Sequence, residues 1–305
     1  MAASLSGDDS LVVVADHVSA ASLSLLRRAV EPYGGVKVIE NGGARGKKQA
    51  QRVGVAAAAN DVIVSVDADC RVCGRFADAV RLAVADMAGR PFMLLLPVEM
   101  LGGGSFFGSL VELEFGCLQV VTAGSALSGR PTMANGAGMA FSRSLYEGHD
   151  SRPDYASGDD MFLLAHASHV GAEVRYLPVS EVVVSSVSPC GVGAYLRQRT
   201  RWLAKAGGYR SAGVIALALV VFVAVISWPV AAVAAFCGEA SWWQVVGLLA
   251  LKLLADASAC AAWLFFRRGW RGLKALWLSL PLEIVYPLMT VVVACRAAVA
   301  DRSRW

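Results

Sequence analysis

The sequence predicts an α/β domain with a mostly parallel sheet flanked by helices, followed by a C-terminal bundle of transmembrane helices. Up to about residue 205, short apolar strands alternate with helical segments and with short connections, which is typical of a mostly parallel sheet. From about residue 212 onward, three apolar runs are each long enough to cross a hydrocarbon core of roughly 30 Å. We therefore place a globular domain at 1–210 and a membrane domain at 211–305.

The expected elements of the globular domain follow from hydrophobic periodicity. In its first part we expect strands at 11–15, 36–39 and 62–66, with helices at 22–30 and 47–59 between them. In its second part we expect helices at 75–88, 105–121 and 161–170, strands at 92–98, 173–177 and 181–185, a short apolar segment at 134–141 and a basic helix at 194–206.

The three apolar runs are expected to span the membrane at 212–236, 242–266 and 273–294. Lys252 and Asp256 are four residues apart, so they share a helix face and can pair with each other. Glu283 lies between two prolines of the third run. Charges within a membrane face a bundle interior or a cavity, so these residues indicate either contacts between helices or a role in transport.

Composition and charge set the expected location. The chain is 56% hydrophobic with a mean hydropathy of +0.53, which is too apolar for an ordinary soluble protein. Lys and Arg precede the first run and fill 267–274, whereas 237–241 contains neither. By the positive-inside rule, the globular domain and the loop 267–274 are cytoplasmic, in a multi-pass protein of the inner membrane. The seven scattered cysteines are those of a reducing compartment.

Two carboxylates follow the strand at 62–66, namely Asp67 and Asp69. In open α/β sheets, ligands bind outside the carboxyl ends of the strands. Two aspartates one residue apart can both turn toward one Mg²⁺ or Mn²⁺ ion, which takes few carboxylates and completes its shell with phosphate oxygens and water. A solvated loop after a strand is the alternative interpretation.

A second acidic pair, Asp159 and Asp160, lies at the expected start of a helix, where backbone N–H groups and the helix dipole stabilise carboxylates. Simple capping explains such a pair. If Ser157 caps the helix instead, one acid remains free to act as a general base toward a hydroxyl group.

The basic helix carries a third motif, Gln198-Arg199-Thr200-Arg201-Trp202. On a helix, Gln198, Arg201 and Trp202 share one face, which suits a pyrophosphate and a sugar ring. Alternatively the helix lies on anionic lipid, for which Arg197, Arg199 and Lys205 are available in either case. Gly46-Lys47-Lys48 lacks a full phosphate-loop pattern, so a Walker-type NTPase is excluded and the Lys47 ammonium at most meets a phosphate.

In this order, Asp67-Ala68-Asp69, Gly158-Asp159-Asp160 and Gln198-x-x-Arg201-Trp202 ahead of membrane helices resemble the membrane-bound glycosyltransferases of family 2. The resemblance covers roughly 11–210 and is supported by the segments 12–16, 46–50 and 135–141. It implies a GT-A fold that transfers a sugar from a nucleotide-activated donor with inversion at the anomeric carbon.

The resemblance also implies roles for single residues. Asp16 contacts the nucleoside; Lys47 and Asn135 belong to the donor site; Asp67 and Asp69 hold the diphosphate, Asp69 through the divalent Mg or Mn ion; Asp160 is the catalytic base beside Asp159; Gln198, Arg201 and Trp202 close over the diphosphate and the acceptor. The family usually has Glu-Asp where this chain has Asp159-Asp160.

Relatives normally begin with a further apolar strand that lines the nucleotide pocket, and residues 1–10 do not supply one. We expect either a truncated chain or a divergent member with a partial pocket.

The expected function is a hexosyltransferase-type enzyme of cell envelope glycan biosynthesis. Its partners are a nucleotide-diphosphate sugar, a lipid-linked or polysaccharide acceptor and membrane lipids, but no nucleic acid. The alternatives are a non-catalytic partner subunit that keeps the fold, and a transporter that uses Lys252, Asp256 and Glu283.

Overall fold

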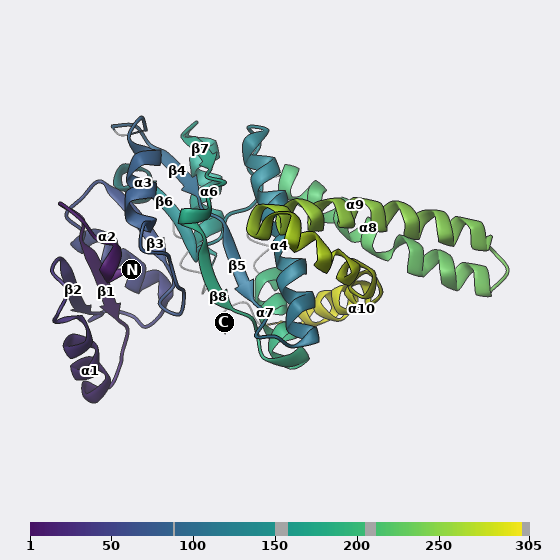
Figure 1. Ribbon diagram of the computed structural model, residues 1–305, viewed down its shortest axis with the longest axis horizontal. Coiled ribbons are helices and arrows are strands. Elements are labelled where there is room, and N and C mark those ends of the chain that lie inside the picture. The colour runs from purple at the N-terminus through teal and green to yellow at the C-terminus, as the bar shows by residue number, and fades with distance from the viewer. Residues whose placement is uncertain (88, 150–157, 205–211, 301–305) are drawn as a thin grey trace. The chain divides into compact units, whose positions relative to one another are not determined.

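A computed structural model describes residues 1–87, 89–149, 158–204 and 212–300 (Figure 1). The chain forms two compact units. The first comprises residues 1–98 and 125–185, and the second comprises 99–124 and 186–301. These units are discontinuous in the chain. The domain boundary that we predict at residue 210 therefore stays a prediction.

The main sheet of the first unit has four strands in the order β3 (Val62–Val66), β6 (Gly138–Ser142), β4 (Phe92–Leu95) and β7 (Glu173–Tyr176). Strand β6 runs antiparallel to both β3 and β4, and only β4 and β7 are parallel. The prediction of a mostly parallel sheet is therefore wrong for these strands. The physical reason is the direction of β6, which cannot be read from a short apolar run.

Two further strands form a separate parallel pair, β1 (Leu11–Ala15) with β2 (Val36–Glu40). Within the part of the chain that the structure describes, no ladder joins β1 or β2 to β3. Helix α2 (Lys47–Ala57) reaches both sheets instead. It packs against β1, and Gln51 Nε2 donates to Ser65 Oγ of β3 over 3.3 Å. The sheet that the sequence predicts as continuous is thus split between β1 and β3.

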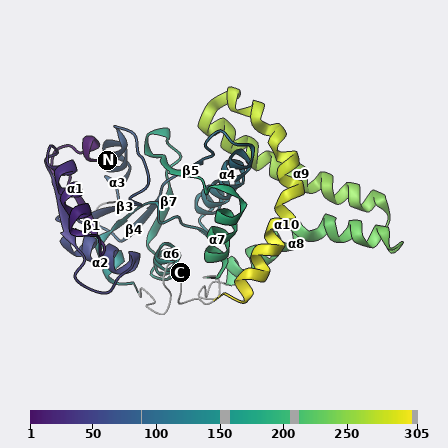
Figure 2. The same cartoon turned by 90° about the horizontal axis from the view of Figure 1, so that it is seen from below.

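The core of the first unit lies on the inner strands. Every residue of β4 and β6 is buried, whereas every residue of β3 is half-buried. Helices α3 (Phe76–Val84) and α6 (Asp159–His169) lie on opposite faces of the sheet (Figure 2). Strands covered on both faces are mostly apolar, as β4 is throughout and as β6 is up to its last residue, Ser142.

Two of the expected strands of the globular domain are each divided into two shorter elements. The expected strand at 92–98 divides into β4 and β5 (Val98–Leu101), because Pro97 has no N–H for a ladder. The expected strand at 181–185 is a 3₁₀ turn, Ser180–Val182, followed by β8 (Val184–Val187), which pairs with β5. The others are a 3₁₀ turn at Ala2–Ser4, α1 (Ala20–Val30) and α5 (Arg143–Glu147).

The second unit is helical. Its helices are α4 (Phe106–Leu127), α7 (Gly191–Ala204), α8 (Ala212–Phe236), α9 (Trp242–Arg268), the 3₁₀ helix η4 (Gly269–Leu278) and α10 (Ser279–Ala298). Helices α8 and α9 pack side by side as a hairpin (Figures 1 and 2). Among the described residues, three helical stretches are long and apolar enough to cross a membrane: Phe106–Leu127, Ala212–Phe236 and Trp242–Ala298.

The predicted spans at 212–236 and 242–266 coincide with α8 and α9. The third, predicted at 273–294, starts too early, because residues up to Leu278 belong to the amphipathic η4. The predicted loop at 267–274 is also wrong. Arg267 lies in the last turn of α9 and donates two hydrogen bonds to the Glu99 carboxylate, at 2.8 and 2.9 Å, and Arg268, the last residue of α9, pairs with Glu112.

Charged side chains join the long helices to one another. Lys252 pairs with Asp256, as the spacing predicts, and its Nζ also lies 3.3 Å from Glu283 Oε2. Trp228 Nε1 of α8 donates to the other Glu283 oxygen over 3.1 Å. The buried Glu283 therefore connects α8, α9 and α10.

Helices α4 and α9 approach closely at one glycine. A Cβ atom on Gly116 would lie 2.1 Å from Cδ1 of the buried Trp263, far inside van der Waals contact. Only a residue without a side chain lets α4 meet the indole at this point.

Candidate active site

The first pair of predicted acids lies where β3 ends. A turn closed by the Cys70 N–H and the Asp67 carbonyl (3.0 Å) holds Asp67 and Asp69 at the carboxyl end of the strand. The Arg71–Ser185 bridge fixes the chain directly after this turn. Lys47, the first residue of α2, forms an ion pair with the Asp67 carboxylate. The structure therefore joins Lys47 and Asp67, which are 20 residues apart, in one site.

The second pair of acids reaches the same site through the loop before β6. The Gly136 N–H donates to Asp160 Oδ2 over 3.0 Å, and the Asp160 Oδ1 accepts from the Met161 N–H. A Cβ atom on Gly136 would lie 3.5 Å from Asp160 Oδ2 and 3.6 Å from Lys47 Nζ. Asp67, Lys47 and Asp160 thus converge around Gly136, a residue that we did not predict.

Asn135 and Gly158 shape this loop and helix, and the donor-site role of Asn135 stays a prediction. The Asn135 Oδ1 accepts from the Ala137 N–H (3.0 Å), which closes a local turn before β6. Gly158 forms the N-cap of α6 with a φ of 104°, a left-handed conformation that favours glycine. Ser157, which we considered as the cap, lies outside the described residues.

Asp159 is in a different environment from Asp160. It is 8% exposed, and burial raises the pKa of its carboxyl above the ordinary value. The Lys48 ammonium, 3.4 Å away, opposes this shift of the pKa. The sequence did not indicate Lys48, although it directly follows Lys47 and points to the other acidic pair.

Asp16 organises the loop that leads into α2. Its Oδ1 accepts from His17 Nδ1 (2.9 Å) and Asn41 Nδ2 (2.7 Å), and its Oδ2 accepts from the Gly46 N–H (2.9 Å). The bond from His17, followed by that from Asn41, lowers the pKa of Asp16. Asn41 is buried and was missed in the sequence, because a single asparagine in a glycine-rich turn carries no distinct pattern.

The family assignment follows from comparison with known proteins. The family model described as "Glycosyltransferase like family 2" matches residues 1–204, about two thirds of the chain. The chain belongs to this family. Comparison with curated proteins finds no match.

Among solved structures, the chain is similar to a mannosyltransferase from Pyrobaculum calidifontis in complex with GDP-Man and Mn2+. The two chains are 19% identical, with a TM-score of 0.49, over 95% of this chain and 76% of the other.

The third motif of this family member lies on α7 in the second unit. Arg201 is exposed, while Gln198 and Trp202 are half-buried. The expectation that Arg199 is available for lipid is wrong, because the residue is only 7% exposed and its guanidinium pairs with Glu114 of α4. Helical spacing alone could not reveal this, since it does not tell which face of α7 meets α4.

The residues of the acidic site suit a divalent metal that arrives with phosphate. Among the described residues, no group of three His, Cys, Asp or Glu side chains is arranged to hold a metal ion. Asp67 and Asp69 provide hard carboxylate oxygens, and Mg²⁺ and Mn²⁺ are commonly bound by one or two carboxylates together with substrate phosphates. The donor set therefore fits a metal whose shell the nucleotide completes.

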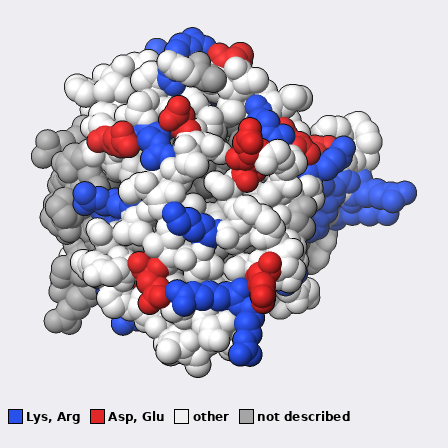
Figure 3. All heavy atoms as spheres, turned by 90° about the vertical axis from the view of Figure 1, so that its left-hand side faces the viewer, with Lys and Arg blue, Asp and Glu red and all other residues white. Residues whose placement is uncertain are grey.

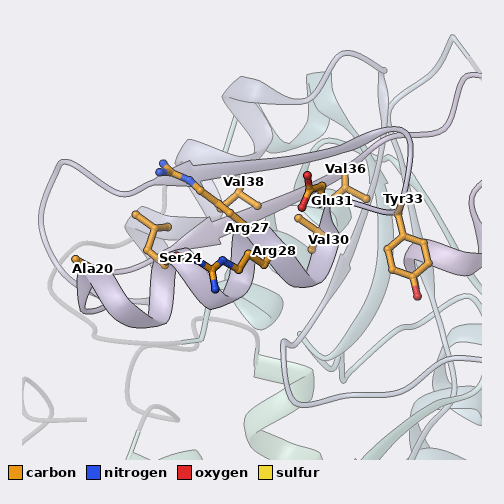
Figure 4. A pocket seen from close by; sticks show the side chains of 10 residues that line it. Ala20, Ser24, Arg27, Arg28, Val30, Glu31, Tyr33, Val36 and Val38 are labelled. Carbon is orange, nitrogen blue, oxygen red and sulfur yellow. The ribbon is translucent and has the colours of Figure 1, made fainter.

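A groove of about 680 Å³ lies elsewhere in the first unit, between α1 and β2 (Figure 4). None of the residues that line it belongs to the predicted site. On the face of the first unit shown in Figure 3, basic and acidic side chains are interspersed. Arg27, which lines the groove, pairs with Glu40 of β2 over 2.9 Å. We assign the groove no role in the reaction.

Proposed function

We propose that this family 2 member is an inverting, hexosyltransferase-type enzyme that transfers a sugar from a nucleotide-diphosphate sugar to a hydroxyl group. The observation that carries the proposal is the convergence of Lys47, Asp67 and Asp160 around Gly136. A cation and carboxylates from three separate segments meet at one edge of the sheet. Such a group suits a donor that carries a diphosphate and an acceptor that must lose a proton.

In this proposal Asp160 is the catalytic base. The Gly136 N–H orients its carboxylate, and a positioned carboxylate takes the proton from the attacking hydroxyl. Asp159 is the less suitable base, because it is buried beside Lys48. Attack from the side opposite the departing diphosphate gives inversion, through a centre with oxocarbenium character.

The diphosphate leaves with negative charge, which Lys47 is placed to stabilise. Asp67 and Asp69 would hold the divalent metal, Mg or Mn, which supplies further positive charge to the leaving group when it is bound. Asp16 supports the pocket from its side, since it fixes the 41–46 loop with two hydrogen bonds, from Asn41 and Gly46. We propose that Asp16 contacts the nucleoside.

The acceptor and the location are also part of the proposal. The apolar helices favour a lipid-linked acceptor, or a growing glycan delivered at the bilayer, on the cytoplasmic face of the inner membrane. We propose that Gln198, Arg201 and Trp202 of α7 contact the diphosphate and the acceptor, which follows from the family motif. We also propose that the enzyme acts in cell envelope glycan synthesis. Its glycosyltransferase domain would end at residue 210 and its membrane domain would begin at residue 211.

The test is binding of nucleotide-diphosphate sugars to the full chain in detergent, with and without Mn²⁺. We expect metal-dependent binding by the wild type and its loss in Asp69→Asn. The matched control is Asp61→Asn, whose side chain is 97% exposed. Asp160→Asn should bind the donor normally but transfer sugar at least about 100-fold more slowly.

If the wild type folds stably and binds no nucleotide sugar, the proposal is wrong. A non-catalytic partner subunit would then be the better interpretation. If Asp160→Asn transfers sugar at the wild-type rate, another group is the base.

A further inference from the structure

A buried ion pair in the second unit has no part in the proposed chemistry. It joins Arg199 of α7, 7% exposed, to Glu114 of α4, 6% exposed. Burial of two charges is costly unless their geometry is good and their remaining polar atoms are bonded. The other contacts of the Arg199 guanidinium therefore decide what the buried pair does.

The Arg199 guanidinium contacts two residues of the family motif. Its Nη1 donates to Gln198 Oε1 over 3.2 Å, and its central carbon lies 4.2 Å from the centroid of the Trp202 ring. Phe115 of α4 contacts the same indole, with ring centroids 6.0 Å apart. Arg199 is thus placed between α4 and the two motif side chains.

These contacts fix the orientation of the Gln198 amide. A guanidinium has only donors, so the amide must turn its oxygen toward Arg199. Its NH2 group then points away from Arg199. Such a group suits a phosphate or hydroxyl oxygen. The stacking of Trp202 on the guanidinium likewise limits the indole to one ring plane.

We propose that Arg199, fixed by Glu114, is a positioning residue that orients Gln198 and Trp202 toward the ligand. This inference rests on the proposed function, which assigns both side chains to the donor and the acceptor. A purely structural tie between α4 and α7 is the competing explanation. The two differ in what substitution does to ligand affinity at constant stability.

The first experiment measures binding of UDP and of GDP, each with Mn²⁺, to the full chain in detergent by calorimetry. Arg199→Lys keeps a cation for Glu114 but loses the planar fork that also reaches Gln198. We expect about tenfold weaker binding, the usual cost of one lost charge-assisted hydrogen bond. The matched control is Arg197→Lys, at an exposed position of the same helix, which should bind like the wild type.

The second experiment is a double-mutant cycle with Gln198→Ala, with thermal midpoints measured for every variant. If Arg199 acts through Gln198, Arg199→Lys should weaken binding much less in the Gln198→Ala background. Additive losses of affinity would overturn the inference. So would a lower thermal midpoint of Arg199→Lys with unchanged affinity.

A third variant covers the case in which Arg199→Lys does not fold. Gln198→Glu keeps and strengthens the bond to Arg199 but presents no NH2 group to the ligand. We expect it to bind nucleotide about tenfold more weakly without loss of stability. Wild-type affinity of this variant would overturn the inference.

The outcomes separate this inference from the proposed function. If the wild type binds neither UDP nor GDP, the proposed function fails and the inference fails with it. If the wild type binds and Arg199→Lys equals Arg197→Lys, only the inference fails.

Discussion

The neighbouring carboxylates of Asp159 and Asp160 differ in their exposure to water. Asp159 and Asp160 start the same helix, yet only Asp159 is buried, and burial raises the pKa of its carboxyl. The folded protein therefore binds the Asp159 proton more tightly than the unfolded chain does. The protonated Asp159 carboxyl contributes to the stability of the fold at pH values below its pKa in the unfolded chain, about 3.8. This contribution is lost as the pH rises through the pKa that Asp159 has in the folded protein.

We therefore predict that Asp159→Asn gains stability relative to the wild type as the pH rises from about 4 to about 8. The asparagine keeps the shape of the side chain but cannot ionise. Urea unfolding at both pH values measures the difference. Asp61→Asn, which changes an exposed carboxylate, should show no such trend. An Asp159→Asn difference that is the same at both pH values would contradict the assigned cause.

Two of the residues that meet around Gly136 could be named from the sequence, and their roles stay a proposal. Asp67 and Asp160 were identified as candidates because their residue types and positions are informative without coordinates. Gly136 and Asn41 were not, because they act through backbone geometry and loop bonds. Arg199 was assigned to the wrong surroundings, since its partner Glu114 is 85 residues away in the chain.

At the scale of elements, the contact of α4 with α9 depends on the absence of a side chain at Gly116. We predict that Gly116→Ala lowers the free energy of unfolding by about 1–3 kcal/mol, because its methyl group would overlap the Trp263 indole. Gly124→Ala on the same helix is the control, since no atom lies within 4 Å of its added Cβ. That change should be neutral or stabilise by up to about 1 kcal/mol.

The midpoint of thermal unfolding in detergent, measured for both variants, checks this prediction. Equal midpoints for the two would mean that α4 and α9 do not meet at Gly116.

Helices were predicted better than the sheet for a physical reason. Helical periodicity is a local property, so α1, α2 and α6 appear close to their expected bounds. Strand direction and strand neighbours depend on contacts between distant segments. The antiparallel β6 and the split between β1 and β3 could therefore not be derived from apolar runs.

At the scale of the whole molecule, the charge distribution predicts a membrane topology that the native cysteines can report. Cys237 is exposed between α8 and α9, and Cys73 of the first unit and Cys190 of the second are exposed at positions that precede these helices in the chain. If the segments with many Lys and Arg residues are cytoplasmic, Cys237 should be the one of these three that an impermeant maleimide labels in intact spheroplasts. Permeabilised cells should show labelling at all three.

Single Cys→Ser variants assign each label to its site. Labelling of Cys73 in intact spheroplasts would reverse the proposed orientation. If Cys237 is unlabelled in intact spheroplasts but labelled after permeabilisation, α8 and α9 do not cross as a hairpin.

The division of the sheet between β1 and β3 has a consequence for cooperativity. Residues 11–40 share no backbone ladder with the four-stranded sheet, so the β1–β2 pair can open while the core strands stay closed. Local opening of this kind would release Asp16 and the loop that it fixes, yet leave Asp67 and Asp160 in place. A nucleotide that contacts both parts would add to the coupling that α2 provides between the two sheets. Ligand binding would then slow amide hydrogen exchange in β1 and β2 far more than in β4 and β6.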